Sequence, residues 1–304
     1  MKKVLLLNLF CLIVFPLFGQ LDAGNYQLLY DKMLFNPAFT GSRDAAHIAV
    51  AYRSAWGNNV DGAPISQIIS AHSPLKDQRI AIGATFRLNA IGVTQKWEIG
   101  LSYAYRIKVK SGLLSIGLRT STTAYRIKYS ELRAETLADA ALPQNNESLY
   151  YTNYGVGLMY YNDQWYFGVS VPKLTNRDNE ELEDEFRELA TQDQRSFYIT
   201  TGGILKLTDK IKLLPGIIVE NGSERLDVSL NFNMVYFDRL WTGFIYSSDG
   251  LFEANIKVQA ASRLRLGFGQ TFEMNELNRY HNGGFMVRAE YQFRDKNQKP
   301  SILF

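Results

Sequence analysis

The sequence predicts an all-β protein, a transmembrane antiparallel β-barrel of about 14 strands. Three observations predict it. An export signal opens the chain, no later segment has the ~20 consecutive apolar residues of a membrane-spanning helix, and many segments alternate apolar with polar residues. A soluble β-sandwich also alternates and is the competing interpretation, but the apolar strand faces here are many and long.

The first 19 residues have the form of a signal peptide. Lys2 and Lys3 precede an apolar run that ends at Phe18, and Gly19 supplies the small residue at the predicted cleavage site. The single cysteine, Cys11, lies inside this segment. The mature chain is therefore expected to contain no disulfide and no thiolate metal site.

Charge composition argues against a nucleic-acid partner. The chain has 33 Lys and Arg against 30 Asp and Glu, a net charge of +3, so there is no basic excess to attract phosphate backbones.

The clearest alternation runs from Trp97 to Ile107. The odd positions are apolar, whereas the even positions, from Glu98 to Arg106, are small or charged. A period of two predicts a strand whose two faces meet different surroundings. The same pattern recurs in residues 80–88, 226–234 and 285–293.

Fourteen candidate strands follow along the chain, and their even number places both ends of the mature chain on one side, the periplasm. Their expected centres lie near residues 49, 68, 83, 102, 118, 156, 168, 201, 215, 230, 243, 256, 268 and 288. The connections predicted to be periplasmic are short, at residues 74–78, 110–112, 162–164, 208–210, 237–239 and 261–262. The two longest, near residues 127–149 and 172–195, both fall on the outer side, as in outer-membrane barrels.

The predicted inward face carries charges of both signs, which indicates ion pairs in a hydrated lumen. These residues are Glu98, Arg106, Arg119, Asp227, Arg265, Arg288 and Glu290. Inward glycines at positions 83, 100, 117 and 267 indicate that something packs closely on the inner wall. The segment 21–41 precedes the first strand and is the candidate plug. The expected divisions are a signal peptide (1–19), a periplasmic or plug segment (20–44), the barrel (45–293) and a polar tail (294–304).

Several blocks resemble the PorP/SprF family, outer-membrane proteins of the type IX secretion system of Bacteroidetes. They are LFNPAFTGS (34–42), YRSAWGNNVDGAPISQIISAHSPL (52–75), YAYRIKV (103–109), LSIGL (114–118) and GVSVPKL (168–174). The resemblance covers essentially the whole mature chain, and its N-terminal blocks are the most specific. The polar tail after Phe293 departs from the family pattern.

The resemblance implies a partner rather than a reaction. Family members are associated with secretion of large cargo proteins, often gliding adhesins, that carry a type-B C-terminal signal domain, and are thought to hold that domain at the outer membrane. The expected partners are such a cargo, other components of the secretion system and outer-membrane lipid.

Two segments are candidate partner-binding sites. In the first, Trp56 is a candidate anchor beside a turn that contains Asn58, Asp61, Gly62 and Pro64. An ordinary hairpin connection explains the same turn.

In the second, residues 179–190 have the pattern of a short amphipathic helix. Leu182, Phe186 and Leu189 form its apolar stripe. A helix lying over its own barrel mouth and a docking helix for a partner both fit this stripe.

Catalysis, cofactors and metals are not expected. The histidines, His47, His72 and His281, lack the spacing of metal ligands, and His72 is expected on a strand at the membrane edge or in the lumen. No serine lies in a nucleophile elbow. Two functions stay open from sequence: a non-enzymatic anchor for secreted cargo, and a plugged channel or transporter for hydrophobic or small solutes.

Overall fold

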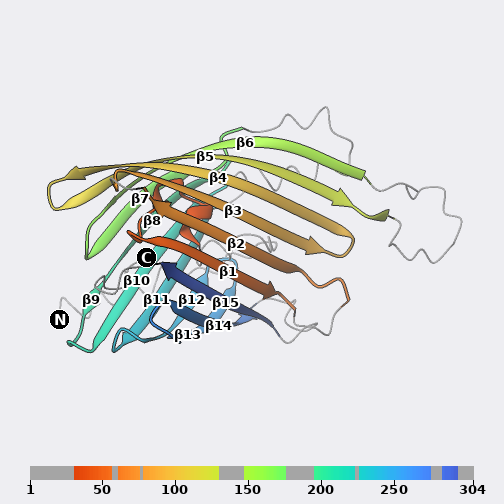
Figure 1. The fold of residues 1–304 in the computed structure, drawn as a ribbon. Coiled ribbons are helices and arrows are strands. Elements are labelled where there is room, and N and C mark those ends of the chain that lie inside the picture. Colours follow the sequence, from red (N-terminus) through yellow and green to blue (C-terminus); the bar gives the residue numbers. More distant parts are fainter. Residues whose placement is uncertain are drawn as a thin grey trace, which may run out of the picture.

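The computed structural model describes residues 31–56, 61–75, 78–129, 147–175, 195–222, 226–274 and 283–293. In these residues one antiparallel sheet closes on itself to form a barrel (Figure 1). Its strands are β1 (Ala46–Ser54), β2 (Ile65–Pro74), β3 (Ile80–Ile91), β4 (Thr94–Val109), β5 (Gly112–Ile127), β6 (Glu147–Tyr161), β7 (Trp165–Val171), β8 (Phe197–Gly203), β9 (Leu205–Lys206), β10 (Ile211–Asn221), β11 (Leu226–Tyr236), β12 (Leu240–Ser247), β13 (Leu251–Gln259), β14 (Leu264–Glu273) and β15 (Gly284–Phe293).

The described sheet has fifteen strand segments but fourteen strands. β8 and β9 are separated only by Ile204, and both pair with β10, so they are one interrupted strand. β1 pairs with β15, and β10 pairs with β11, which completes the ring. The predicted fold class and strand number are confirmed, and each predicted strand centre falls within a strand.

The alternation of faces is also as predicted. Along β4, outward Leu101 is 57% exposed, whereas inward Glu98 and Arg106 are each 3% exposed. The outward residues of β5 change from apolar to polar along the strand. Ile116 and Leu118 are apolar, whereas Thr120, Thr122 and Arg126 are polar or charged. We infer that the end of β5 beyond Leu118 leaves the apolar band.

The two ends of the barrel differ in the length of their connections. At one end, which we call the short-turn end, strands are joined by residues 75–79, 110–111, 162–164, 207–210, 237–239 and 260–263. The opposite, long-loop end carries the two longest connections, 128–146 and 172–196. This distribution matches the sequence prediction.

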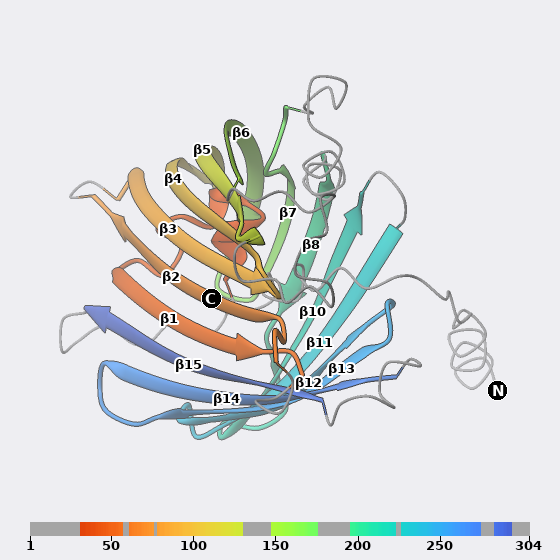
Figure 2. The same cartoon turned by 90° about the vertical axis from the view of Figure 1, so that its right-hand side faces the viewer.

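The described chain begins inside the barrel. Two short 3-10 helices, η2 (Lys32–Leu34) and η3 (Pro37–Phe39), are capped by the side chains of Asp31 and Asn36. Figure 2 shows this segment within the ring, beside β6 and β7. η3 contacts β4, β5 and β6. Residues 31–44 therefore form the plug predicted for 21–41. Residues 21–30, the signal segment and the C-terminal tail lie outside the described residues.

In the part of the chain that the structure describes, no helix is both long and apolar enough to cross a membrane.

A charge on the outward face of β4 is expected to weaken the barrel. Leu101→Arg should lower the free energy of unfolding by about 2–4 kcal/mol, because the guanidinium would face lipid. The measurement is urea unfolding of the barrel from lipid vesicles. The matched control, Thr122→Arg, lies on the polar outward part of β5 and should cost less than half as much. Equal losses would contradict the position assigned to the apolar band.

Candidate functional site

The plug rests on a surface of glycines, which we define as Gly117, Gly157 and Gly168 on β5, β6 and β7. Gly117 and Gly157 lie opposite one another in the sheet. A Cβ atom at Gly117 would collide with the backbone of Ala38, and one at Gly157 would collide with the side chain of Asn36. The inner wall is therefore shaped to admit the backbone of the plug.

Hydrogen bonds fix the start of the NPAFTG turn to β6 and β7. The Asn36 amide donates to the carbonyl oxygens of Leu158 (3.3 Å) and Val169 (3.5 Å). The Ser170 hydroxyl donates to the carbonyl oxygen of Phe35 at 2.8 Å. Buried backbone groups of an irregular segment need such partners, because the lumen side of the plug offers them little water.

The end of the same turn is held by three other strands. The Ser115 hydroxyl of β5 donates to the Ala38 carbonyl at 2.8 Å. The Gly41 N–H donates to Nδ1 of His72 on β2 at 3.2 Å, and Arg106 of β4 donates to the Gly41 carbonyl at 2.8 Å. His72 is thus a lumen residue, one of the two places expected for it.

Aromatic packing completes the attachment. The Phe35 ring lies 5.7 Å from Tyr198, and the Phe39 ring lies 5.5 Å from Tyr166, between ring centroids. Phe35 is fully buried and Phe39 is 3% exposed. Truncating a buried Phe to Ala costs about 3–5 kcal/mol, so this cluster strongly favours the plugged arrangement.

A second segment folds inward at the long-loop end. Pro172 lies against Gly155, where a Cβ atom would collide with it. Leu174 N–H donates to the Tyr154 carbonyl at 2.7 Å, and Lys173 reaches Glu98 on β4 at 3.3 Å. The end of GVSVPKL therefore folds into the lumen, nearer the long-loop end than the plug.

Glu98 is the centre of a buried ion cluster. Arg87 and Arg119 each approach its carboxylate to 2.9 Å, in addition to Lys173. This confirms the predicted pairing of inward charges. It also corrects one detail: the atoms close to Gly100 belong to the Arg119 guanidinium of the wall rather than to the plug.

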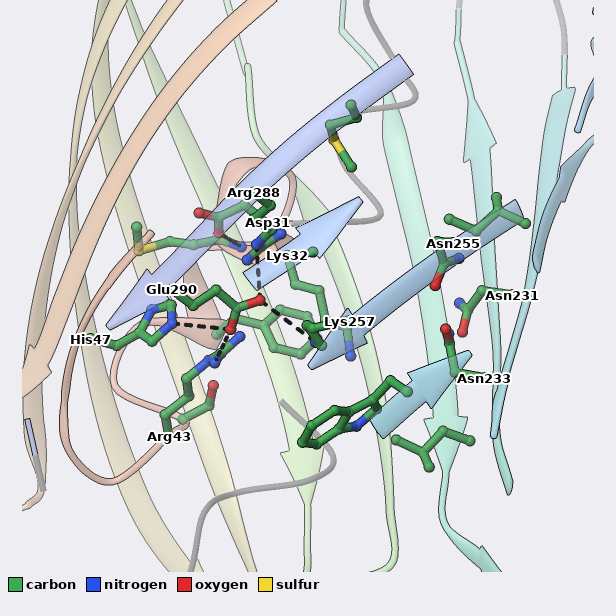
Figure 3. Close-up of a pocket in the computed structure, with 18 of the residues that line it drawn as sticks. Asp31, Lys32, Arg43, His47, Asn231, Asn233, Asn255, Lys257, Arg288 and Glu290 are labelled. Carbon is green, nitrogen blue, oxygen red and sulfur yellow. Dashed lines mark hydrogen bonds and ion pairs between the residues drawn. The ribbon is translucent and has the colours of Figure 1, made fainter. Parts of the chain in front are cut away.

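A cavity of about 170 Å³ separates the plug from the β10–β15 wall (Figure 3). Glu290 lines the cavity and pairs with Arg43 at 2.7 Å, Arg288 at 2.9 Å and Lys257 at 3.6 Å. Nε2 of His47 lies 3.4 Å from the same carboxylate. One carboxylate is thus shared by cations from the plug, β13 and β15.

Three amides line the opposite side of the cavity, at Asn231, Asn233 and Asn255 (Figure 3). Asn231 lies over Gly216 of β10 and Asn233 lies over Gly243 of β12, where Cβ atoms would displace them. Because these glycines have no side chain, the asparagine amides can pack directly against the backbone of the neighbouring strand.

Inward glycines are therefore used in two ways. Gly83 and Gly117 receive the plug as predicted, with Sδ of Met33 2.6 Å from a Cβ built at Gly83. Gly267 does not, because a Cβ atom there would find no atom closer than 3.7 Å. It borders the cavity instead.

Lys32 points from the plug toward this cavity. Its Nζ lies 4.2 Å from the centroid of the Tyr166 ring and 5.5 Å from that of Phe39. Burial, together with the charges of Arg43 and Arg288, lowers the pKa of Lys32 to about 7.

The first predicted partner-binding segment lies at the long-loop end. Ala55 N–H donates to the Pro64 carbonyl, and Gly92 N–H donates to the Gly62 carbonyl, each at 2.9 Å. Gly62 has φ +74°, which favours glycine. This clips the β1–β2 connection onto the β3–β4 turn. Asp61 and Gly62 are exposed, Trp56 is half-buried and Pro64 is buried. Asn58, Leu182, Phe186 and Leu189 lie outside the described residues, and all eight partner roles stay predictions.

No group of three or more His, Cys, Asp or Glu side chains that could hold a metal ion occurs within the described ranges.

The outer ends of β5 and β6 form a ledge, defined as residues 121–127 and 148–155. β6 pairs with β5 along its whole length but with β7 only over residues 156–161. The preceding part of β6 therefore runs beyond β7 for about 30 Å at ~3.3 Å per residue. On its other side the ledge is continuous with β4, which pairs with β5 as far as Ile127, and Figure 1 shows the long β5 and β6 side by side.

The two faces of the ledge differ. Its inner face has a small core of its own, where Tyr125 and Ile127 are buried and the Tyr125 and Tyr151 rings stack with centroids 6.2 Å apart. Its outer face presents Tyr150 and Tyr154, which are 68% and 59% exposed.

A family model described as the type IX secretion system membrane protein PorP/SprF matches residues 18–291. The chain belongs to the PorP/SprF family. The blocks that carried the resemblance now have positions in the structure: LFNPAFTGS is the plug, and the end of GVSVPKL is the segment that reaches Glu98. No curated protein matches the sequence.

Solved structures with a similar fold are outer-membrane proteins. Omp33 of Acinetobacter baumannii matches with a TM-score of 0.52 at 8% identity, over 84% of this chain and 100% of that one. The toluene transporter TbuX of Ralstonia pickettii matches with a TM-score of 0.53 at 11% identity, over 86% of this chain and 92% of that one. At these identities the likeness shows the barrel fold alone.

The sequence pattern does not predict the cavity or the ledge. Alternation alone placed Asn231, Asn233 and Glu290 on the inward face, but nothing in the pattern showed that they surround one cavity. The ledge had a usable signal, since the outward positions of β5 change from apolar to polar at Thr120.

A larger side chain at Gly117 is expected to release the plug. In a Thr40→Cys background, whose one other cysteine, Cys11, lies in the predicted signal peptide, a membrane-impermeant maleimide should label slowly because position 40 is fully buried and the substitution is nearly isosteric. Adding Gly117→Val should raise the labelling rate at least tenfold, because the new side chain occupies the place of Ala38. Gly267→Ala is the matched control and should leave the rate within twofold. Unchanged labelling in both variants would contradict the packing of Ala38 against Gly117.

Proposed function

We propose that this PorP/SprF barrel is a non-enzymatic anchor that holds a secreted cargo protein at the cell surface. Family membership supports a role in type IX secretion. The observation that carries the anchor is the ledge, a sheet extension beyond the apolar band with two large aromatic side chains exposed on it. Tyrosine is enriched among the residues that dominate binding energy at protein interfaces.

The proposal orients the barrel with its short-turn end in the periplasm and its long-loop end outside the cell. Short periplasmic turns and longer outer loops are the usual arrangement of bacterial outer-membrane barrels. Both mature termini then lie on the periplasmic side, and the ledge and the clipped Asp61–Gly62 turn lie where secreted cargo emerges. The proposed cargo carries the C-terminal signal domain that the family resemblance implies.

The filled lumen favours an anchor over a conduit. The plug makes buried hydrogen bonds to β2, β4, β5 and β7. The segment after β7 adds a second layer over it through Lys173 and Glu98. Opening a path along this half of the barrel requires breaking both sets of contacts, whereas an anchor needs neither to move.

The second candidate is a plugged transporter, and the cavity is the observation in its favour. TbuX, which shares the fold, is a toluene transporter. The cavity of this chain is lined by Arg43, Lys257, Arg288 and three asparagines, which suit a polar solute better than a hydrocarbon.

The ledge tyrosines provide the test. In the native host, the double variant Tyr150→Ser, Tyr154→Ser is expected to lose at least tenfold of the large secreted protein that co-purifies with the tagged barrel in mild detergent. Two interface tyrosines that each contribute about 1 kcal/mol or more give a change of this size. The measurement is quantitative mass spectrometry of the captured proteins, with cell-surface retention of the same cargo scored in parallel.

The matched control is Phe237→Asn at the short-turn end. Phe237 is 64% exposed, and its φ of +53° is one that Asn tolerates. This variant should retain cargo at the wild-type level. Loss of cargo in the control but not in the tyrosine variant would place the binding surface at the opposite end and refute the orientation. Wild-type retention in both would refute the ledge as the anchor.

A further inference from the structure

The electrostatics of the lumen cavity are unbalanced. Three cationic side chains among its described lining residues, Arg43, Lys257 and Arg288, face two carboxylates, Asp31 and Glu290, and Lys32, with its pKa lowered to about 7, adds part of a further charge. The Asp31 carboxylate also accepts the N–H of Met33 at 3.1 Å, where it caps η2. In a partly buried space, surplus positive charge attracts an anion more strongly than it does in bulk water.

Trp241 restrains Lys257, one of the cations that line the cavity. Nζ of Lys257 lies 5.3 Å from the centroid of the Trp241 ring, and Cζ of Arg265 lies 5.0 Å from it. The indole is 3% exposed, so it is a fixed support. The cation–π contacts therefore limit the positions that Lys257 can adopt.

The amides of Asn231, Asn233 and Asn255 face the cations across the cavity (Figure 3). Each amide both donates and accepts hydrogen bonds, a combination that matches hydroxyl groups. At about 170 Å³, the cavity has room for about six water molecules at ~30 Å³ each. It therefore suits a small molecule with one acidic end and a hydroxylated body.

We propose that the cavity binds a monomeric sugar acid, with its carboxylate toward Arg43 and Lys257 and its hydroxyl groups toward the three asparagines. Arginine and lysine form charge-assisted hydrogen bonds with carboxylates, and the asparagines supply orientation. The site is independent of the anchoring function, because it lies in the lumen between the plug and the β10–β15 wall, away from the ledge.

Lys32 supports the same assignment. The neighbouring charges of Arg43 and Arg288 contribute to its lowered pKa. A bound carboxylate offsets these charges and favours the protonated form of Lys32. The plug then contributes a cation to the site.

The test is isothermal titration calorimetry on the purified full-length barrel in detergent, with glucuronate, glucose and acetate as the three probes. Glucuronate is expected to bind at least tenfold more tightly than either of the others, since it alone uses both the cations and the amides. Equal affinity for glucose would overturn the role of the cations. Equal affinity for acetate would overturn the role of the amides.

Asn231→Asp tests the location. It is nearly isosteric and places a negative charge in the cavity, so glucuronate affinity should fall at least tenfold. The matched control, Asn162→Asp, lies in the β6–β7 turn, where the side-chain oxygen accepts backbone N–H groups and a carboxylate does the same. It should bind within twofold of wild type. Lys257→Gln is the second variant, should Asn231→Asp fail to fold, and is expected to weaken binding at least fivefold. No glucuronate binding by the wild type, or undiminished binding by the cavity variants, would overturn the proposal.

Discussion

Backbone hydrogen bonding in lipid is the constraint on which the rest of this structure depends. Hydrocarbon offers no partner for an N–H or C=O group, so a sheet in the membrane must close on itself. The pairs β1–β15 and β10–β11 complete that closure. Closure gives every strand an outward face that meets lipid and an inward face that meets a confined space. The alternation along β4, with Leu101 outward and Glu98 inward, is the local expression of this constraint.

A closed ring creates a second problem, because its interior must be filled by water, by side chains or by a folded segment of the chain. This barrel divides the interior unequally. On the β2–β8 side, Gly117 and Gly157 leave room for the plug backbone against the wall. Nearer the long-loop end, Arg87, Arg119 and Lys173 gather around Glu98. On the β10–β15 side, Gly216 and Gly243 contact asparagine amides rather than the plug. Glycine thus provides a close-packed surface for the plug in one half and a cavity wall lined by amides in the other.

The sequence predicted the parts that depend on a local repeat. Strand number, strand faces, the two ends and the inward position of Glu290 all follow from a period of two and the spacing of turns. The plug was predictable because glycines at inward positions such as Gly83 and Gly117 have no other evident use. The cavity was not, since it brings together the plug residue Arg43 with Lys257 and Asn231, which are far apart in the chain. An inward glycine such as Gly267 leaves space, and only the three-dimensional arrangement shows what occupies it.

The ledge and the lumen are held together by one short segment. Residues 172–175 leave β7, fold against the inner side of β6 and place Lys173 on Glu98. The amide of Asn153 on β6 donates to the Thr175 carbonyl at 2.9 Å, and Thr175 N–H donates back to the same side chain at 3.0 Å. The base of the ledge is therefore fixed to the buried ion cluster. A partner bound at Tyr150 and Tyr154 would pull on a strand that is clamped to the plugged half of the barrel, and such rigidity suits an anchor that must resist force.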